Sequence, residues 1–564
     1  MNTIKLFLKA HTYWLVFGLI VLFFICLHIP GVRLPYHQDE YKWPMYANPT
    51  LDSAGAIPHP PLTEFLYRII GGKIGLDNFR FIPFFFGVLN IFLVFYLAKT
   101  IFNKKTALFA VLLFAVSFYS LLASLMVDVD GAVMPFFFLL SLIGYYKLKE
   151  VDFDVRKSIQ WLFVLGLGVL GGFLIKVVFV IPIAVLAIDF AIEKSMFSDK
   201  KKVMKVLASG VVGVCILVLI LVLAKFVFPF FKLDYAIKYW EHFINFGNRN
   251  WFQILIQVIK SILYLSPLLL LPVFFIHKEL FKKTRPLCMF LVFEIIFYLV
   301  LFDFSSGALD RYFQFMIIPL CIISAGIISE MFELEESRRN KEFILLGSLV
   351  AFILLLLVFI PHFVPALHPK SAWLSRIVGF KWNFLYPFSG GSGPMGFYVS
   401  FLFMSLSWII SVGLIILGFF KPTLRKMSLL MLIPIGIIYN LVFSEEYLFG
   451  KINGSAPMLL TSSVEYIKNN PNITSVVVYN DNGGYEIQKL GKYSRRLYAD
   501  PAFENGYKDF FKTFSGHVLY INVPRIDPNS FYSQYLNSCK NIFERDDQYV
   551  SAIVYDCQNI KNKK

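Results

Sequence analysis

The stretch HTYWLVFGLIVLFFICLHIP, residues 11–30, is an almost wholly apolar run of membrane-spanning length. As a helix it would be about 30 Å long, which matches the hydrocarbon core of a bilayer. The chain has 564 residues, of which 57% are hydrophobic and 16% charged, and its mean hydropathy is +0.65. This composition excludes a water-soluble fold of this length and predicts an all-α polytopic membrane protein.

Similar apolar runs recur along the chain and predict about 13 transmembrane helices. They lie near residues 11–30, 80–98, 106–123, 131–147, 159–175, 177–192, 206–230, 255–276, 287–303, 312–329, 343–361, 395–420 and 427–443. Residues 1–443 are therefore the expected transmembrane domain. The remaining residues, 444–564, have a different composition and are expected to form a separate domain.

The formal net charge of +16 does not indicate a nucleic-acid partner, because the basic residues lie mostly in short loops between apolar runs. With the N-terminus in the cytoplasm, six alternate loops, such as KLKEVDFDVRK at 147–157, each carry at least three Lys or Arg. The opposite loops at 124–130 and 304–310 carry no Arg or Lys. The positive-inside rule then predicts that residues 444–564 are extracytoplasmic. The expected location is a bacterial inner membrane.

The loop PYHQDEYKWPMYANPTLDSAGAIPHPPL, residues 35–62, lies on the predicted extracytoplasmic side. Its Asp39 and Glu40 follow the first apolar run closely. Carboxylates so near a bilayer are costly unless they face a polar cavity, which favours a functional site. The alternative is an acidic loop that is simply solvated.

Further charges border the same predicted face. Asp128 and Asp130 precede the fourth run and suit a hard cation or a polyhydroxylated ligand, unless they are only a solvated pair. Lys176 is the single charge of a long apolar stretch, so it either snorkels to the surface or binds an anion such as a lipid phosphate. Arg80 and Arg311 open the second and tenth runs, and guanidinium groups suit phosphate.

Two histidines lie on this face as well. His59 stands in PHPPL, and His242 stands in the aromatic segment YAIKYWEHFINFGNRNWF, which is typical of an interfacial amphipathic helix. A single interfacial histidine is usually structural, whereas two beside acids can also bind a metal.

Five motifs occur in a set order: Asp39-Glu40, HPPL at 59–62, VDVDGAVMPFF at 127–137, FLIK at 173–176 and YWEHFINF at 239–246. Together they resemble GT-C type glycosyltransferases of families 39 and 83. These families include the protein O-mannosyltransferases and the ArnT-like lipid A aminoarabinose transferases. The resemblance covers residues 1–445 and implies the GT-C fold with an external C-terminal domain.

The resemblance also implies a function. The donor would be a polyprenyl-phosphate-linked sugar, and the acceptor a lipid, a glycan or a protein, with membrane lipids as surroundings and no nucleic acid. Asp39 would be the general base or would orient the acceptor, with Glu40 beside it. Lys176, Arg80 and Arg311 would hold the donor phosphate. His59 and His242 would bind a divalent metal, and no other cofactor is implied.

Residues 444–564 alternate helix and strand signals, which predicts an α/β domain. ITSVVVYN at 473–480, HVLYINV at 517–523 and YVSAIVYDC at 549–557 are the expected strands. Cys539 and Cys557 are a disulfide candidate if the domain is extracytoplasmic. A scaffold or acceptor-binding role is expected for this domain.

Two other classes of protein fit parts of the sequence. A transporter or flippase for a lipid-linked or polyanionic substrate also has many spans, and Glu294 within the ninth run favours it. A lipid-binding structural protein without chemistry is the third class. The clustering of the other charges at helix ends on one face favours the enzyme.

Overall fold

The computed structural model of the protein describes residues 2–47, 59–228, 231–243, 249–301, 309–333, 338–388, 394–498 and 504–558. The chain divides into two compact units. The first comprises Met1–Val32 and Lys42–Ser337, and the second comprises Arg33–Tyr41 and Arg338–Lys564. The short segment Arg33–Tyr41 thus interrupts the first unit in sequence and folds with the second. The domain boundary expected after residue 443 remains a prediction.

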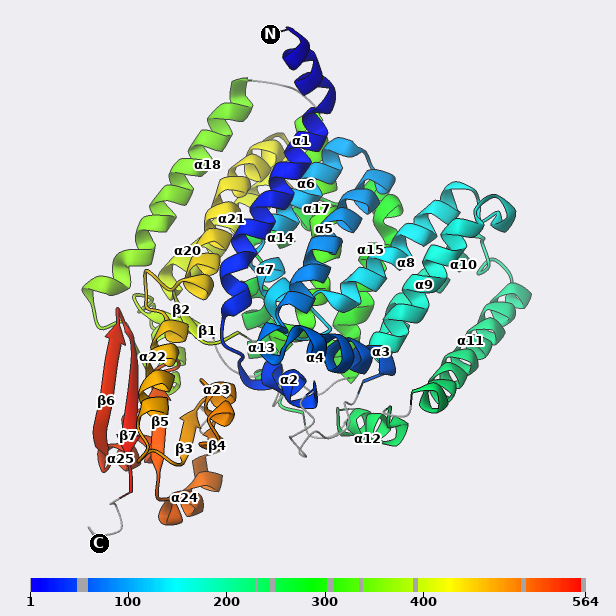
Figure 1. The fold of residues 1–564 in the computed structure, drawn as a ribbon. Coiled ribbons are helices and arrows are strands. Elements are labelled where there is room, and N and C mark those ends of the chain that lie inside the picture. The colour runs from blue at the N-terminus through cyan, green and yellow to red at the C-terminus, as the bar shows by residue number, and fades with distance from the viewer. Residues whose placement is uncertain are drawn as a thin grey trace. The chain divides into compact units, whose positions relative to one another are not determined.

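The first unit is helical throughout the residues described (Figure 1). Its helices are α1 (Asn2–His28), α2 (Lys42–Ala47), α3 (Pro61–Glu64), α4 (Gly71–Ile74), α5 (Phe81–Ile101), α6 (Lys104–Val116), α7 (Phe118–Leu125), α8 (Val133–Glu150), α9 (Ile159–Ile175), α10 (Val180–Glu193), α11 (Lys200–Val227), α12 (Leu233–Phe243), α13 (Trp251–Tyr264), α14 (Pro267–Leu270), α15 (Lys278–Ile296), α16 (Leu309–Tyr312) and α17 (Ile317–Glu333).

Burial separates the central helices of this unit from the peripheral ones. The apolar segment of α17 is 94% buried, and α17 packs against α6, which in turn packs against α5. The apolar segment of α11, in contrast, is 0% buried in the protein. A helix that is apolar on every side and covered by no neighbouring side chains is suited to a lipid environment and not to water.

Two of the expected straight spans are bent. α6 and α7 meet at 67° and α13 and α14 at 92°. At the first bend Ser117 leaves the helical conformation, and its hydroxyl accepts a hydrogen bond from the N–H of Ser120. At the second bend Ser266 caps α14 and Pro267 follows it, where proline tolerates the lack of an N–H. Helix-starting residues inside an apolar run therefore divide these spans.

Over the described residues, twelve of the thirteen expected apolar runs coincide with a helix or with a bent helix pair, whereas the run 395–420 contains a short strand, Phe397–Ser400, and is helical only from Phe401. Eight of the described helices are long and apolar enough to cross a membrane, and ten spans result if each bent pair is one span. α9 and α10 are shorter, with 17 and 14 residues, or about 26 and 21 Å against a bilayer core of about 30 Å. The chain is an integral membrane protein.

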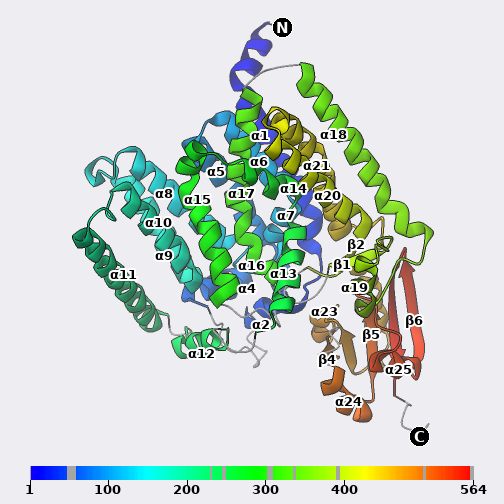
Figure 2. The ribbon, with the colours of Figure 1, turned by 180° about the vertical axis from the view of Figure 1, so that it is seen from behind.

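The second unit combines helices with two sheets (Figures 1 and 2). Its helices are α18 (Arg338–Leu356), α19 (Lys370–Val378), α20 (Phe401–Phe420), α21 (Arg425–Leu448), α22 (Ala456–Asn469), α23 (Gly484–Lys489), α24 (Glu504–Thr513) and α25 (Phe531–Asn537). Strands β1 (Leu385–Phe388) and β2 (Phe397–Ser400) form an antiparallel pair. The other strands are β3 (Val476–Tyr479), β4 (Tyr493–Leu497), β5 (His517–Ile521), β6 (Lys540–Asp547) and β7 (Val550–Asp556).

These five strands form one sheet in the order β4-β3-β5-β7-β6. β3 runs parallel to β4 and β5, while β7 is antiparallel to β5 and β6. Alternate side chains of β3 enter different cores: Val476 and Val478 pack with residues of α22, and Val477 and Tyr479 pack with residues of α24 and α25. The sheet thus has helices on both faces, and the α/β fold predicted for this region is confirmed.

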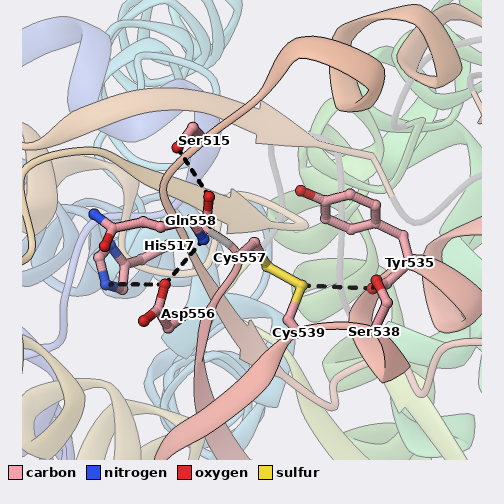
Figure 3. The surroundings of a disulfide bond; sticks show 8 residues. All are labelled: Ser515, His517, Tyr535, Ser538, Cys539, Asp556, Cys557 and Gln558. Carbon is pink, nitrogen blue, oxygen red and sulfur yellow. Dashed lines mark hydrogen bonds and ion pairs between the residues drawn. A yellow bond between two sulfur atoms is a disulfide. The ribbon is translucent and has the colours of Figure 1, made fainter. Parts of the chain in front are cut away.

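A disulfide joins Cys539 to Cys557, as the sequence predicts (Figure 3). Cys539 precedes β6 and Cys557 follows β7, next to the terminal pair of the ladder, Lys540 and Asp556. The bond therefore closes the open end of the β6–β7 hairpin. With a sequence separation of 18 residues, it stabilises the domain by roughly 3 kcal/mol in the chain-entropy model.

Candidate functional site

The acidic loop between α7 and α8 is fixed by backbone contacts. The carboxylate of Asp128 accepts a hydrogen bond from the N–H of Val129 at 2.6 Å, and the carbonyl of Asp128 accepts one from the hydroxyl of Tyr67 at 2.7 Å. At Gly131 a Cβ would lie 2.5 Å from the carbonyl oxygen of Ala123, so only glycine permits this close approach. Asp128 and Asp130 are both buried. They are not the solvated pair that was the alternative reading.

Lys176 pairs with the second acid of this loop. Its Nζ lies 2.6 Å from Oδ1 and 2.7 Å from Oδ2 of Asp130. Lys176 follows the last turn of α9 in an extended conformation, and Thr63 binds the carbonyl of the preceding Ile175 at 2.6 Å. The lysine is 7% exposed. It is therefore a buried ion-pair partner and not a side chain that snorkels into water.

Arg311 pairs with the first acid of the loop. Its Nη1 lies 2.8 Å from Oδ2 of Asp128, and its Nη2 donates to the hydroxyl of Tyr312 at 2.6 Å. The Tyr312 ring centroid is 4.7 Å from Nζ of Lys176 and also 4.7 Å from Cζ of Arg311. Two buried ion pairs therefore share one aromatic ring. We call Asp128, Asp130, Lys176, Arg311 and Tyr312 the Lys176 site.

His59 and Arg80 also lie at this loop. Burial lowers the pKa of His59 to about 3, the charges of Lys176 and Arg311 lower it further, and Asp128 opposes them. His59 is therefore a neutral imidazole at physiological pH. Arg80 is 2% exposed, and its Nη1 donates to the carbonyl of Leu125 at 2.7 Å, at the end of α7. The structure thus brings five predicted cations and acids and one histidine into one region of the first unit.

Two further polar residues adjoin the site, and sequence reasoning assigned them no role in it. Glu294 on α15 is fully buried, and its electrostatic neighbours are Lys176 and Asp130. Gln314 lies 1% exposed beside Gly131. Within the described part of the chain, neither carboxylate oxygen of Glu294 and neither amide atom of Gln314 has a hydrogen-bond partner. Glu294 stood out in the sequence as a charge within an apolar run, and that signal could have found it.

Asp39 and Glu40 lie in the second unit, in the 3₁₀ turn η2 (Gln38–Tyr41). Glu40 is buried, and its Oε2 accepts a hydrogen bond from the N–H of His37 at 2.9 Å. The N–H of Glu40 in turn donates to the carbonyl of His37 at 3.0 Å. Glu40 thus closes the turn on itself, while Asp39 is half-buried. Catalytic roles for both remain predictions.

The metal site expected at His59 and His242 remains a prediction. Among the residues that the structure describes, no group of three or more His, Cys, Asp or Glu side chains is arranged to hold a metal ion. The side chain of His242 lies outside the described residues, and His59 packs against the ring of Trp43 at 5.8 Å between centroids.

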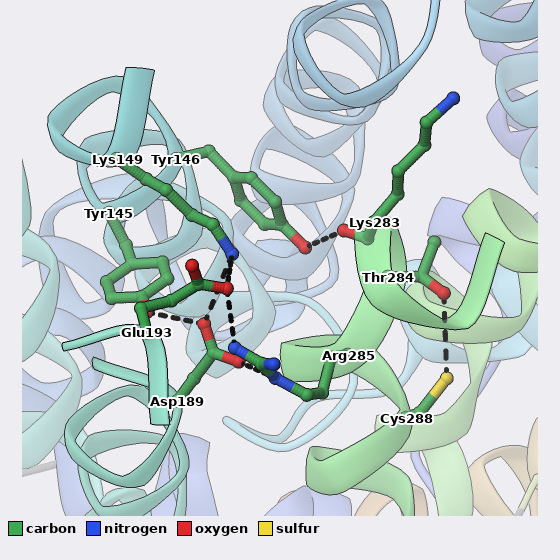
Figure 4. Close-up of polar contacts among 9 residues, drawn as sticks. All are labelled: Tyr145, Tyr146, Lys149, Asp189, Glu193, Lys283, Thr284, Arg285 and Cys288. Atoms are coloured by element: carbon green, nitrogen blue, oxygen red, sulfur yellow. Dashed lines mark hydrogen bonds and ion pairs between the residues drawn. The ribbon is translucent and has the colours of Figure 1, made fainter. Parts of the chain in front are cut away.

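A second, partly buried charged cluster joins α8, α10 and α15 (Figure 4). Asp189 accepts from the hydroxyl of Tyr145 at 2.5 Å, lies 3.6 Å from Nζ of Lys149 and pairs with Arg285. Glu193 lies 2.6 Å from Lys149 and 2.6 Å from Arg285. We call these five residues the Asp189 cluster. Each of its two acids contacts both of its bases, so it connects three helices without leaving a charge unmatched.

The chain resembles known proteins in sequence and in fold. Residues 58–224 match the sequence model of the family described as dolichyl-phosphate-mannose-protein mannosyltransferase. This segment includes His59, Arg80, Asp128, Asp130 and Lys176. No curated protein sequence matches the chain.

Two solved structures of ArnT from Cupriavidus metallidurans have the same fold. The apo structure superposes with a TM-score of 0.54 at 13% sequence identity, over 98% of this chain and 99% of that one. The structure bound to undecaprenyl phosphate gives a TM-score of 0.55 at 13% identity, with the same coverage. The resemblance to GT-C type glycosyltransferases is confirmed, and the fold of the chain is the ArnT-like GT-C fold.

Proposed function

We propose that the protein is an integral-membrane glycosyltransferase that moves a hexosyl or pentosyl group from a polyprenyl-phosphate donor to a lipid, glycan or protein acceptor. The family match and the GT-C fold support glycosyl transfer. ArnT bound to undecaprenyl phosphate, and a family described by a dolichyl-phosphate sugar, support a lipid-phosphate donor.

The observation that carries the proposal is the pairing in the Lys176 site. As the sugar is transferred, negative charge grows on the lipid phosphate. Cations already oriented at the phosphate oxygens stabilise this charge, because they need not move during the reaction. Asp130 and Asp128 hold Lys176 and Arg311 on one ring, Tyr312. A lysine ammonium has three N–H donors, and two contacts go to Asp130, so a third donor remains for a phosphate oxygen.

The reaction that we propose has the following steps. The acceptor hydroxyl oxygen attacks the anomeric carbon, the bond from that carbon to the phosphate oxygen breaks, and the electron pair leaves on the polyprenyl phosphate. The transition state resembles an oxocarbenium ion. Lys176 and Arg311 stabilise the negative charge that grows on the phosphate. Asp39 accepts the acceptor proton as general base.

We assign the reaction to the extracytoplasmic face of a bacterial inner membrane. Six basic loops on the opposite side support this orientation. The Cys539–Cys557 disulfide supports an oxidising compartment for the C-terminal domain. A reporter fused after Lys564 should be active outside the cytoplasm and one fused at Lys201 inside; reversed activities would contradict the orientation.

The test is transfer by the purified protein with a radiolabelled polyprenyl-phosphate sugar. Asp39→Asn keeps the size of the side chain and removes its basic oxygen. The rate should fall roughly 100- to 10,000-fold, the range of general acid–base groups. The matched control is Asp77→Asn, because Asp77 is an exposed acid of the first unit with no proposed role and should leave the rate unchanged. Wild-type transfer by folded Asp39→Asn would reject the base assignment.

Glu294 is the observation that favours the second candidate, a transporter or flippase. It is a fully buried acid in a membrane-length helix, as expected for a transport pathway. A flippase would move the labelled lipid across a vesicle membrane without forming a glycosylated product. The same preparation therefore separates the two candidates.

A further inference from the structure

The segment that carries Asp39 is anchored to the α/β domain of the second unit. His37 and Gln38 are both buried, and their side chains lie 3.2 and 3.4 Å from the carbonyl oxygen of Asn480. The ring of Tyr36 meets that of Tyr485 at 5.0 Å between centroids. A loop beside the first transmembrane helix thus has its partners more than 400 residues later in sequence.

Asp481 is the buried acid at the centre of this contact. It is 1% exposed, and its carboxylate is hydrogen-bonded to the hydroxyl of Tyr41, the last residue of the segment. Burial raises the pKa of Tyr41, and the neighbouring carboxylate of Asp481 raises it further. The hydroxyl of Tyr41 therefore keeps its proton and remains a donor to Asp481.

The turn that presents Asp481 has an unusual backbone. Asn480 and Asp481 have φ of 50° and 58°, in the left-handed region that non-glycine residues seldom adopt. At Gly483, with φ of 94°, a Cβ would lie 2.3 Å from a methyl carbon of Leu460. Such conformations persist where the surrounding structure holds them, and they concentrate at functional positions.

Arg496 on β4 links Asp481 to Asp39. Its Nη1 lies 3.4 Å from Oδ2 of Asp481. Burial alone would lower the pKa of Arg496, but the charges around it raise it, chiefly Asp481 and also Asp39. Arg496 therefore stands as a permanent positive charge within electrostatic reach of two carboxylates, one buried in the domain and one on the segment.

We infer that Asp481 and Arg496 are positioning residues for Asp39, so that the α/β domain orients the carboxylate used in transfer. Asp481 holds Tyr41 at the last position of the turn that presents Asp39, and it also holds Arg496, whose charge acts on Asp39. The inference rests on the proposed function. It gives the C-terminal domain a part in the reaction that requires no contact of that domain with the sugar.

The first test is Asp481→Asn in the full chain. A misoriented base should lower kcat about 10- to 100-fold while the donor KM changes by less than about threefold, because donor binding does not use Asp39. Asp509→Asn is the matched control, since Asp509 is an exposed acid of the same domain, paired with Lys512 on its own helix. It should leave both constants unchanged.

The second test uses the pH profile, which a purely structural role would not move. Other titratable groups near Asp39 are Asp481, Tyr498, Tyr41, His37 and Glu40. Loss of the cation in Arg496→Met should make Asp39 harder to ionise, so the acidic limb of kcat/KM should move to higher pH. Arg496→Lys keeps the charge and should return the limb toward its wild-type position.

The outcomes separate this inference from the proposed function. If the wild type transfers no sugar, the proposed function fails. If the wild type is active, Asp39→Asn is inactive and folded Asp481→Asn keeps the full kcat, the inference alone fails, and an unmoved acidic limb in Arg496→Met also overturns it. If Asp481→Asn does not fold, Tyr41→Phe removes only one hydroxyl and should lower kcat about 3- to 10-fold with an unchanged donor KM.

Discussion

The two charged clusters of the first unit differ in how their charges are matched. In the Asp189 cluster two acids and two bases contact one another in every combination, and Tyr145 adds a donor. In the Lys176 site each acid has one cation, and Glu294 lies nearby with no hydrogen-bond partner among the described residues. Both clusters are charged, and each contains at least one buried acid. The number of partners separates a cluster that joins helices from one that can accept a ligand.

The largest effect on stability is expected in the Asp189 cluster. Arg285→Met leaves Asp189 and Glu193 with Lys149 as their shared base, and breaking a buried pair costs about 3–5 kcal/mol. The unfolding midpoint of the detergent-solubilised protein should fall, while the folded fraction keeps its donor KM. Lys282→Met, an exposed lysine of the same helix, is the control. A rise in donor KM in folded Arg285→Met would remove the distinction between the clusters.

The next largest effect is expected in the Lys176 site and in activity. Lys176→Met removes a charge-assisted bond to the donor phosphate, which costs about 2–5 kcal/mol and corresponds to at least about 30-fold in kcat/KM. The double variant Lys176→Met/Asp130→Asn removes both charges of the pair. It should regain stability but not transfer. Recovery of transfer in the double variant would show that Lys176 acts only by neutralising Asp130.

One chemical change made in both clusters sharpens the contrast. Tyr145→Phe loses a hydrogen bond to the Asp189 carboxylate and should cost about 1.5–3 kcal/mol of stability without changing the donor KM. Tyr312→Phe loses the bond from Arg311 and should raise the donor KM about 10-fold with a smaller change in stability. Thermal unfolding and initial rates of the two variants are the measurements. The same response from both would contradict separate roles.

The smallest effect is a pH dependence set by His59. Its pKa is about 3 in the folded protein against 6.5 for the free side chain, so between these values the unfolded chain binds more protons. Acidification through this window should therefore destabilise the wild type more than His59→Gln. Lys176→Met should weaken the dependence, because Lys176 contributes to the low pKa. If the unfolding midpoint of Lys176→Met depends on pH as strongly as that of the wild type, the charge of Lys176 does not affect His59.

The sequence predicted the membrane class, the helices and most strands of the C-terminal domain, because burial in lipid or in a sheet requires long apolar patterns. It missed β4 and β6, which are the two edge strands and carry charged residues, YSRRL and KNIFERDD. Edge strands keep charges because one side is unpaired. The bends at Ser117 and Pro267 were also missed, since apolar content alone does not report helix starts.

The residues of the Lys176 site could be predicted from the sequence, but the ion pairs that they form could not. Lys176 and Asp130 were singled out separately, but they are 46 residues apart and their pairing depends on how α9 packs against α8. In the sequence, Arg285 is one of the basic residues that indicate topology, and Asp189 has no assigned role. Both residues gain a role only because the ends of three helices meet. Nothing local in residues 33–41 indicates that they fold with residues 338–564.

This discontinuous unit has a consequence for synthesis. His37 and its partner Asn480 are separated by 443 residues, and ribosomes add about 5–20 residues per second. The segment that carries Asp39 therefore emerges roughly 20–90 s before the turn that orders it exists. During that time the helices of the first unit can insert into the membrane, but the turn around Asp39 lacks the partner residues that hold it. We expect a cross-link between cysteines placed at these two positions to form only in chains long enough to include the whole sheet.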